Sequence, residues 1–223
     1  MLLDANVVAA HYLSKASTPK IALRMEKILA ASRTRGKAGN SLILYVPNFC
    51  VAEVFNVFRK YRFGKWSRKV LSNGPIPQRE YQHIYAKFQK DIHNGRLFYH
   101  YELSRYHLLN TALVSPIDHH YAYERQGKEK KNPSPMSTFD LLIIGIAIEL
   151  VRLHGKENVV LVTADNRIRQ IMRRAATIPE SVVKELGLHQ AARLVGTRFS
   201  NSLYPQVLHL GHASTAEFER LLH

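Results

Sequence analysis

Four acidic residues stand inside or at the ends of strongly apolar segments, where an isolated charge is costly. They are Asp4, Glu53, Asp140 and Asp165. Carboxylates that lie close together repel one another unless a cation is present, and an all-oxygen ligand set favours a hard divalent ion, Mg²⁺ or Mn²⁺. Such an ion can activate a water molecule and neutralise a phosphate, so these residue types predict phosphodiester hydrolysis.

Two of the four acids end predicted strands. Asp4 follows the apolar residues of MLLD (1–4), and Asp165 ends NVVLVTAD (158–165), the clearest strand pattern in the chain. In a parallel sheet with right-handed crossovers, the carboxyl ends of the strands lie at one edge, where ligands of open α/β sheets bind. We therefore expect these two carboxylates to converge.

The other two acids stand near the starts of predicted helices. Glu53 belongs to a helix that begins at Pro47-Asn48 and continues to Gly64, and Asp140 to an apolar helix that is capped by Ser137 and ends near Gly155. Helices that follow parallel strands begin at the same sheet edge, so all four acids could face one cleft.

Each acid also has a local interpretation. Asp140 could complement the helix N-terminus together with Ser137, Asp165 could cap a helix over 166–174, and Asp4 could bond within a turn. Glu53 is harder to explain locally because Val51, Ala52, Val54 and Phe55 surround it in sequence. The ordered set is therefore stronger evidence than any single member.

Strand and helix patterns alternate along the chain, which predicts an α/β fold with a parallel sheet flanked by helices in one domain over 1–223. The other predicted elements are a helix from Thr18-Pro19 to about Ala31, a strand at 42–46, a helix at 78–94 that Gly95 stops, a strand at 97–103 followed by the cap Ser104, a strand at 206–210 and a terminal helix with a capping box of Ser214 and Glu217.

The excess of positive charge is large and unevenly distributed. The net charge is +15, and residues 54–135 alone carry +9 together with eight of the eleven tyrosines. This combination favours a polyanionic partner, above all a nucleic acid that contacts cations through phosphates and stacks its bases on aromatic rings. The alternative is a solvated basic face over an aromatic core. Residues 116–136 are polar, and KEKKNPSP (128–135) predicts a basic loop outside the core.

Cysteine content and hydropathy argue for a cytoplasmic protein. Cys50 is the only cysteine, so the chain can form neither an internal disulfide nor a cysteine-based zinc site. The N-terminal residues lack a cationic leader, and Asp4 interrupts them. The most apolar run, 141–148, is far shorter than the ~20 residues that cross a bilayer. We therefore expect no export signal and no membrane partner.

In four blocks the sequence resembles the PIN-domain nucleases, and among them the VapC-type endoribonucleases. The blocks are LLDANVV with Asp4 and Asn6, VPNFCVAEVFNVF with Glu53, MSTFDLLIIGIAIEL with Ser137, Thr138 and Asp140, and VVLVTADNRI with Thr163 and Asp165. They occur in the family's order over residues 2–168. The segment 59–136 is longer and more basic than in compact members, and 177–223 forms a C-terminal extension with the last strand and helix.

The resemblance implies a Rossmann-like sheet, an acidic site for Mg²⁺ or Mn²⁺ made by Asp4, Glu53, Asp140 and Asp165, and cleavage of RNA. Polar positions that would support the carboxylates are Asn6, Thr138 and Thr163. Many similar proteins are toxins that pair as homodimers and are held inactive by an antitoxin protein, so both kinds of partner are expected here.

Several basic residues are candidates for RNA contacts. Arg167 and Arg169 follow Asp165 on one predicted helix, where one of them would face the substrate and a solvated face is the alternative. Lys128, Lys130 and Lys131 would bind the phosphate backbone without sequence preference.

Two other function classes compete with a nuclease. A non-catalytic RNA- or ribosome-binding module would use the basic middle segment equally well, but carboxylates beside a polyanion repel phosphate unless a metal intervenes. A phosphatase with Asp4 as its nucleophile is disfavoured, because such families usually place a second aspartate two residues later, where this chain has Asn6.

Overall fold

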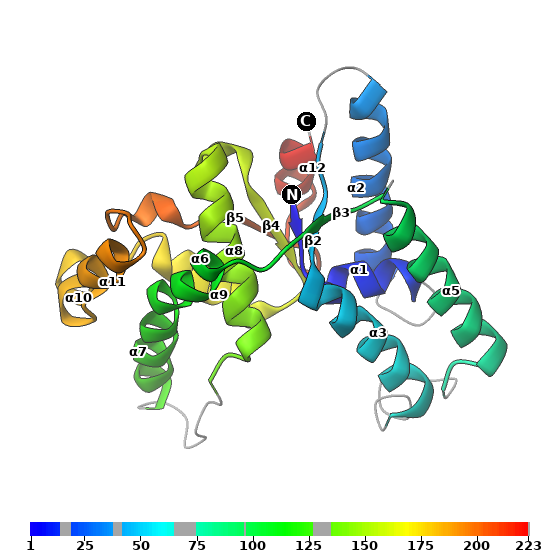
Figure 1. Ribbon diagram of the computed structural model, residues 1–223, viewed down its shortest axis with the longest axis horizontal. Helices are drawn as coiled ribbons and strands as arrows, with labels where there is room; N and C mark the ends of the chain where they lie inside the picture. The colour runs from blue at the N-terminus through cyan, green and yellow to red at the C-terminus, as the bar shows by residue number, and fades with distance from the viewer. Residues whose placement is uncertain (14–18, 38–41, 65–74, 96, 127–134, 223) are drawn as a thin grey trace. The chain divides into compact units, whose positions relative to one another are not determined.

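Figure 1 shows the computed structural model, which describes residues 1–13, 19–37, 42–64, 75–95, 97–126 and 135–222. The chain divides into two compact units. Unit 1 comprises Met1–Glu102, Val162–Ala164 and Leu208–His223, and unit 2 comprises Leu103–Leu161 and Asp165–Val207. The predicted lysine contacts Lys128, Lys130 and Lys131 lie outside the described residues.

The protein is an α/β protein with a five-stranded parallel sheet flanked by helices, as the alternating pattern predicts, and this architecture is consistent with a Rossmann-like fold. The strand order is β3-β2-β1-β4-β5. The strands are short: β1 is Leu2–Leu3, β2 Tyr45–Pro47, β3 Tyr99–Tyr101, β4 Val160–Thr163 and β5 Gln206–His209. All four residues of β4 are buried, as expected of a strand that is covered on both faces.

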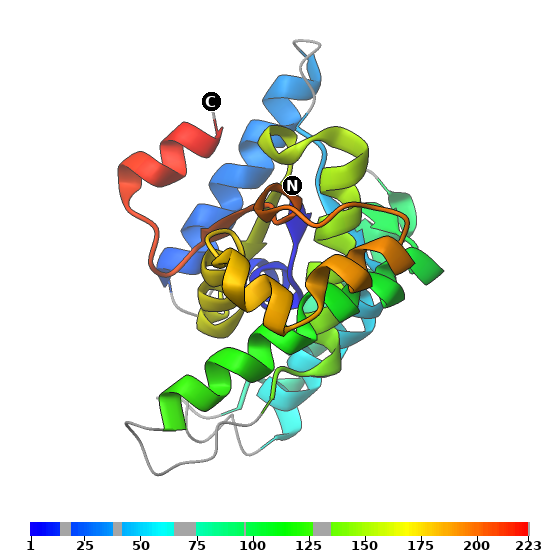
Figure 2. The same ribbon diagram turned by 90° about the vertical axis from the view of Figure 1, so that its left-hand side faces the viewer.

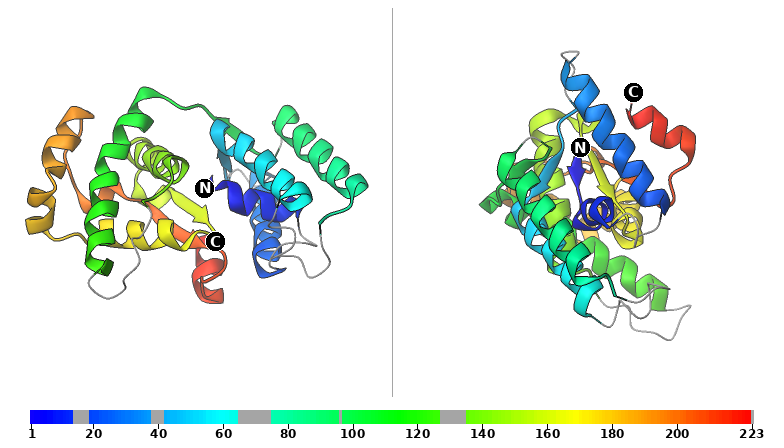
Figure 3. Two further views of the ribbon diagram at one scale, coloured as in Figure 1. Left: turned by 90° about the horizontal axis from the view of Figure 1, so that it is seen from below. Right: turned by 90° about the vertical axis from the view of Figure 1, so that its right-hand side faces the viewer.

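Unit 1 holds five helices among its described residues: α1 Ala5–Tyr12, α2 Pro19–Lys37, α3 Asn48–Phe63, α5 Gln78–Asn94 and α12 Thr215–Leu222. An aromatic cluster joins α1, α3 and α5, since the Tyr12 ring lies 5.9 Å from Phe58 and 5.1 Å from Phe88 between centroids. Figure 3 shows α3 and α5 side by side. The aromatic residues of the predicted basic and aromatic segment are therefore partly core residues here.

Helices α2 and α12 also lie side by side, although they come from opposite ends of the chain (Figures 2 and 3). Arg24 on α2 is buried and donates hydrogen bonds to the carbonyls of Leu210 (2.8 Å) and Ala213 (2.7 Å), just before α12. The Arg24 guanidinium also lies 5.2 Å from the centroid of the Phe218 ring. These contacts connect α2 to the segment before α12 and to α12 itself.

The helices described in unit 2 are α6 Arg105–Asn110, α7 Ser115–Gln126, α8 Thr138–His154, α9 Asn166–Ala175, α10 Glu180–Glu185 and α11 Leu188–Leu194. Helix α8 packs on α6 at Gly145, where a β-carbon would collide with the carbonyl oxygen of His107. The Asn110 side chain bonds the Gly145 carbonyl at 3.1 Å. A glycine in this apolar helix thus permits the close approach of the two helices.

Most predicted elements are confirmed, with small shifts of their ends. Three differences are larger. The predicted helix from Pro19 ends at Lys37 rather than near Ala31. The helix α1 was not predicted, because VVAA continues the apolar pattern of the strand before it. No helix was predicted in the polar segment that begins at 116, but its first part belongs to α7, which buries Ile117 completely.

Candidate functional site

Asp4 lies in unit 1, immediately after β1 and at the N-cap position of α1. The residue is 4% exposed. Its amide donates to the carbonyl of Val162 at 3.0 Å, and the Thr163 hydroxyl donates to Asp4 Oδ2 at 2.7 Å. Thr163 was predicted to support a carboxylate, and in this geometry it holds Asp4 through one charge-assisted hydrogen bond.

The other two site residues predicted in unit 1 are less buried. Glu53 lies in the second turn of α3 and is half-buried, although its sequence neighbours are apolar, because only Val54 among those neighbours is buried. Asn6 is exposed on α1. Neither residue is therefore a core residue.

Asp140 lies in unit 2, in the first turn of α8, and forms a reciprocal capping box with Ser137. The Ser137 hydroxyl donates to Asp140 Oδ2 at 2.8 Å and its amide donates to the same oxygen at 3.2 Å, while the Asp140 amide donates to Ser137 Oγ at 3.2 Å. The second oxygen, Oδ1, accepts no hydrogen bond from the described part of the chain. The capping role thus occupies only half of this carboxylate.

Burial raises the pKa of Asp140 above its usual value. The hydrogen bonds from Ser137 oppose this shift, the negative charge of Asp165 reinforces it, and the positive charge of Arg167 opposes it more weakly. The negative charge of Asp165 thus disfavours the ionised form of Asp140. Two carboxylates in this relation gain from a shared cation, which removes the repulsion.

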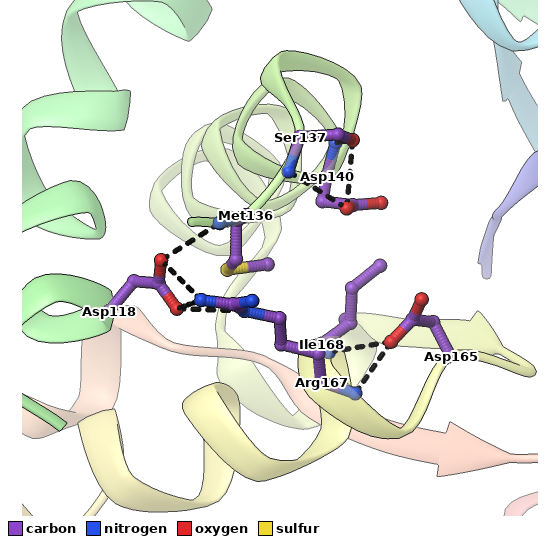
Figure 4. Close-up of polar contacts among 7 residues, drawn as sticks. All are labelled: Asp118, Met136, Ser137, Asp140, Asp165, Arg167 and Ile168. Carbon is purple, nitrogen blue, oxygen red and sulfur yellow. Dashed lines mark hydrogen bonds and ion pairs between the residues drawn. The ribbon is translucent and has the colours of Figure 1, made fainter. Parts of the chain in front are cut away.

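Asp165 follows β4 and caps α9, as its local interpretation predicts. Its Oδ1 accepts hydrogen bonds from the amides of Arg167 (2.5 Å) and Ile168 (3.3 Å), and Figure 4 shows both contacts. Asp140 and Asp165 are thus both helix-capping residues. Capping fixes each carboxylate at a helix N-terminus, where the positive end of the helix dipole also favours negative charge.

A third carboxylate, Asp118, was not predicted as part of the site. It lies on α7, and its side chain is 6% exposed. Arg167 donates to Asp118 Oδ1 from Nε (3.0 Å) and Nη2 (2.8 Å) and to Oδ2 from Nη2 (2.9 Å), while the Met136 amide donates to Oδ2 at 3.0 Å (Figure 4). The dipeptide Ser115-Pro116 is a helix-start signal that could have predicted α7, but not the partner of Asp118.

The predicted RNA-binding arginines are both half-buried on α9. The Arg167 guanidinium is engaged by Asp118, and Arg169 Nε is buried without a hydrogen-bond partner within the described residues. Thr138, predicted to support the carboxylates, is exposed as the first residue of α8. The Arg167 side chain is thus held in an ion pair with Asp118 and does not lie on a solvated face, which was the alternative prediction.

The described residues include no group of three or more His, Cys, Asp or Glu side chains that could hold a metal ion by themselves. Asp4 and Glu53 belong to unit 1 and Asp140 and Asp165 to unit 2, so the convergence of all four stays a prediction. A site with two carboxylates still fits magnesium, because Mg²⁺ commonly binds one or two carboxylates and completes its shell with water and substrate phosphates. Asp140 and Asp165 are a pair of this kind.

Unit 1 contains a cavity of about 590 Å³ that includes none of the predicted site residues. Its lining mixes cations with carboxylates, namely Lys87 and Arg79 with Glu26 and Glu80. His11 contributes to the lining as well. The mixed charge distinguishes this cavity from the acidic pair of unit 2.

In the part of the chain that the structure describes, we find no helix with the length and apolar character needed to span a membrane. No family model matches the sequence, and no curated protein or solved structure is detectably similar to it. The functional interpretation therefore depends on the residues and their geometry.

Proposed function

We propose that this protein is a metal-dependent endoribonuclease of the PIN-like type. The observation that supports the proposal best is the pair Asp140 and Asp165, which two separate helix caps hold close enough for their charges to interact. Maintaining two partly buried carboxylates near each other costs stability unless a cation joins them. A divalent ion provides a reason for this arrangement that helix capping alone does not.

Asp140 and Asp165 would hold the ion, and Asp4 and Glu53 are further ligands predicted by the sequence. A bound Mg²⁺ or Mn²⁺ would supply a water of lowered pKa and positive charge for the phosphate oxygens. The capping bonds from Ser137 and from the α9 amides orient the two carboxylates before substrate arrives. Attack of water on phosphorus with departure of the 3′-oxygen would leave a 5′-phosphate and a 3′-hydroxyl.

The net charge supports RNA as the substrate. A charge of +15, of which +9 lies in residues 54–135, attracts the phosphate backbone and offsets the repulsion between RNA and the acidic site. The resemblance to VapC-type proteins extends the proposal to a toxin that forms a homodimer and is inhibited by an antitoxin. Copurification with a small acidic protein encoded beside this chain would test that extension.

The direct test compares the wild-type protein with Asp140→Asn on end-labelled single-stranded RNA in Mg²⁺, in Mn²⁺ and in EDTA. We expect cleavage by the wild-type protein with either metal, none in EDTA, and a loss of at least about 100-fold in Asp140→Asn. Glu185→Gln is the matched control, because it removes one negative charge from an exposed position of the same unit.

The chemistry of the product ends separates this activity from a contaminating ribonuclease. Metal-activated water predicts 5′-phosphate and 3′-hydroxyl ends, whereas attack by the 2′-hydroxyl of RNA leaves a cyclic phosphate. Tight binding of RNA by both proteins without metal-dependent cleavage would contradict the proposal. It would favour the non-catalytic RNA-binding module, with Asp140 and Asp165 serving only as caps.

A further inference from the structure

Arg167 is the cation that stands closest in sequence to the predicted metal ligands, two residues after Asp165. Its charge acts on Asp140, and its own backbone amide donates to Asp165 Oδ1. An arginine in this position is a natural counter-ion for two carboxylates, because its guanidinium carries a permanent charge and several donors. Arg167 nevertheless does not bond either of them through its side chain in the contacts that Figure 4 draws.

The Arg167 side chain instead runs away from Asp165 toward Asp118 (Figure 4). Asp118 accepts three hydrogen bonds from Nε and Nη2, at distances from 2.8 to 3.0 Å, so that the planar guanidinium is held in one orientation. The Asp118 side chain is 6% exposed and that of Arg167 is 23% exposed. Solvent therefore screens this ion pair less than a surface pair.

Asp118 has a second contact that connects it to the site. Its Oδ2 accepts the amide of Met136, the residue directly before the Ser137 cap of α8. One carboxylate thus binds both the chain that leads to Asp140 and the side chain that follows Asp165. Through these two contacts Asp118 connects α7 to the residues before α8 and to α9.

We propose that Asp118 is a positioning residue that acts through Arg167: it holds the guanidinium away from Asp140 and Asp165, so that a divalent cation can serve as their counter-ion. This inference depends on the metal site of the proposed function and adds a residue that none of the predicted motifs contains. Without Asp118, the freed Arg167 would pair with the two carboxylates and compete with the metal.

The test measures Mn²⁺ binding by isothermal titration calorimetry, without RNA, for four proteins: wild type, Asp118→Asn, Arg167→Gln and the double variant. We expect Asp118→Asn to weaken Mn²⁺ binding by about 10- to 100-fold, the range found when residues that orient metal ligands are changed. Arg167→Gln should bind at least as tightly as wild type. The double variant should match Arg167→Gln, because no guanidinium is left to be released and the side-chain oxygen kept by Asp118→Asn can still accept the Met136 amide.

Thermal unfolding verifies that each variant is folded, and the comparison of Arg167→Gln with the double variant does not require Asp118→Asn to fold. A double variant that binds Mn²⁺ tenfold more weakly than Arg167→Gln overturns the inference, since Asp118 would then act by itself. Equal binding by wild type and Asp118→Asn also overturns it and leaves the metal site intact. A wild-type protein that binds no Mn²⁺ refutes the metal site and this inference together.

Discussion

Asp4 in unit 1 and Asp140 in unit 2 were predicted for the same site, but their surroundings differ in kind. Asp4 is 4% exposed and accepts a short bond from the Thr163 hydroxyl. Asp140 is half-buried, bonds Ser137 through one oxygen only and is repelled by Asp165. The Asp4 carboxylate accepts a hydrogen bond from a hydroxyl within its own unit, whereas the ionised form of Asp140 is disfavoured by the negative charge of Asp165.

This difference shows how to separate a structural acid from an acid that is retained for chemistry. Removing the donor of a buried carboxylate costs free energy, because the carboxylate is then left without that hydrogen bond. A carboxylate whose ionised form is disfavoured by its surroundings is tolerated at some cost in stability, as active-site groups often are. By this criterion Asp140 is the stronger candidate for a functional role, and each prediction below tests the contrast.

The largest expected effect is a separation of activity from stability at Asp140. Asp140→Asn keeps an oxygen that can accept the Ser137 bonds and removes the charge that Asp165 repels. We expect the loss of cleavage described above with an unfolding free energy in EDTA that is unchanged or higher. Urea unfolding of both proteins checks this, and a marked destabilisation would assign Asp140 a structural role.

The opposite behaviour is expected around Asp4. Thr163→Val removes the hydroxyl that donates to the buried Asp4 carboxylate, which should lower the unfolding free energy by about 1–3 kcal/mol. Thr138→Val is the control, because it makes the same change at an exposed position. If the two variants were equally stable, the Asp4–Thr163 bond would contribute nothing and the contrast would fail on the unit 1 side.

A smaller effect concerns the two helix caps that differ between the units. Ser137→Ala removes the cap of α8 and should cost about 1 kcal/mol. Ser214→Ala removes the hydroxyl oxygen that accepts the Glu217 amide at the start of α12 and should cost a similar amount. Only Ser137→Ala should also reduce cleavage, because it frees the Asp140 side chain to rotate. Cleavage assays of both variants at saturating metal test this. Equal cleavage activities of Ser137→Ala and Ser214→Ala would contradict an orienting role of Ser137.

The smallest predicted effect is on the pH dependence of stability in EDTA. Burial raises the pKa of Asp140, so the native state binds this proton more tightly than the unfolded state. Its contribution to stability is therefore most favourable below the usual value of 3.8 and falls as the pH rises through the raised native pKa. The stability of wild type relative to Asp140→Asn should therefore decline as the pH rises above about 4. A difference that does not change with pH contradicts the raised pKa.

Much of the fold was predictable because its signals are local. The caps at Ser137 and Asp165, the helix stop at Gly95 and the buried strand β4 all appear where the residues indicate them. The local signals did not predict α7, because most of its residues are polar. Its core contacts come from Ile117 and neighbouring positions. A composition average over 116–136 could not detect one buried face.

The sequence by itself determined the α/β class, most of the helices and strands, the excess positive charge and the positions of the acids at element ends, because each of these depends on residues that are near one another in the chain. Only the tertiary structure decided the partner of each acid. The bond from Thr163 to Asp4 spans 159 positions and the bond from Arg167 to Asp118 spans 49. A carboxylate looks the same in sequence whether a hydroxyl, a guanidinium or a second carboxylate faces it, and that neighbour decides its energy and its chemistry.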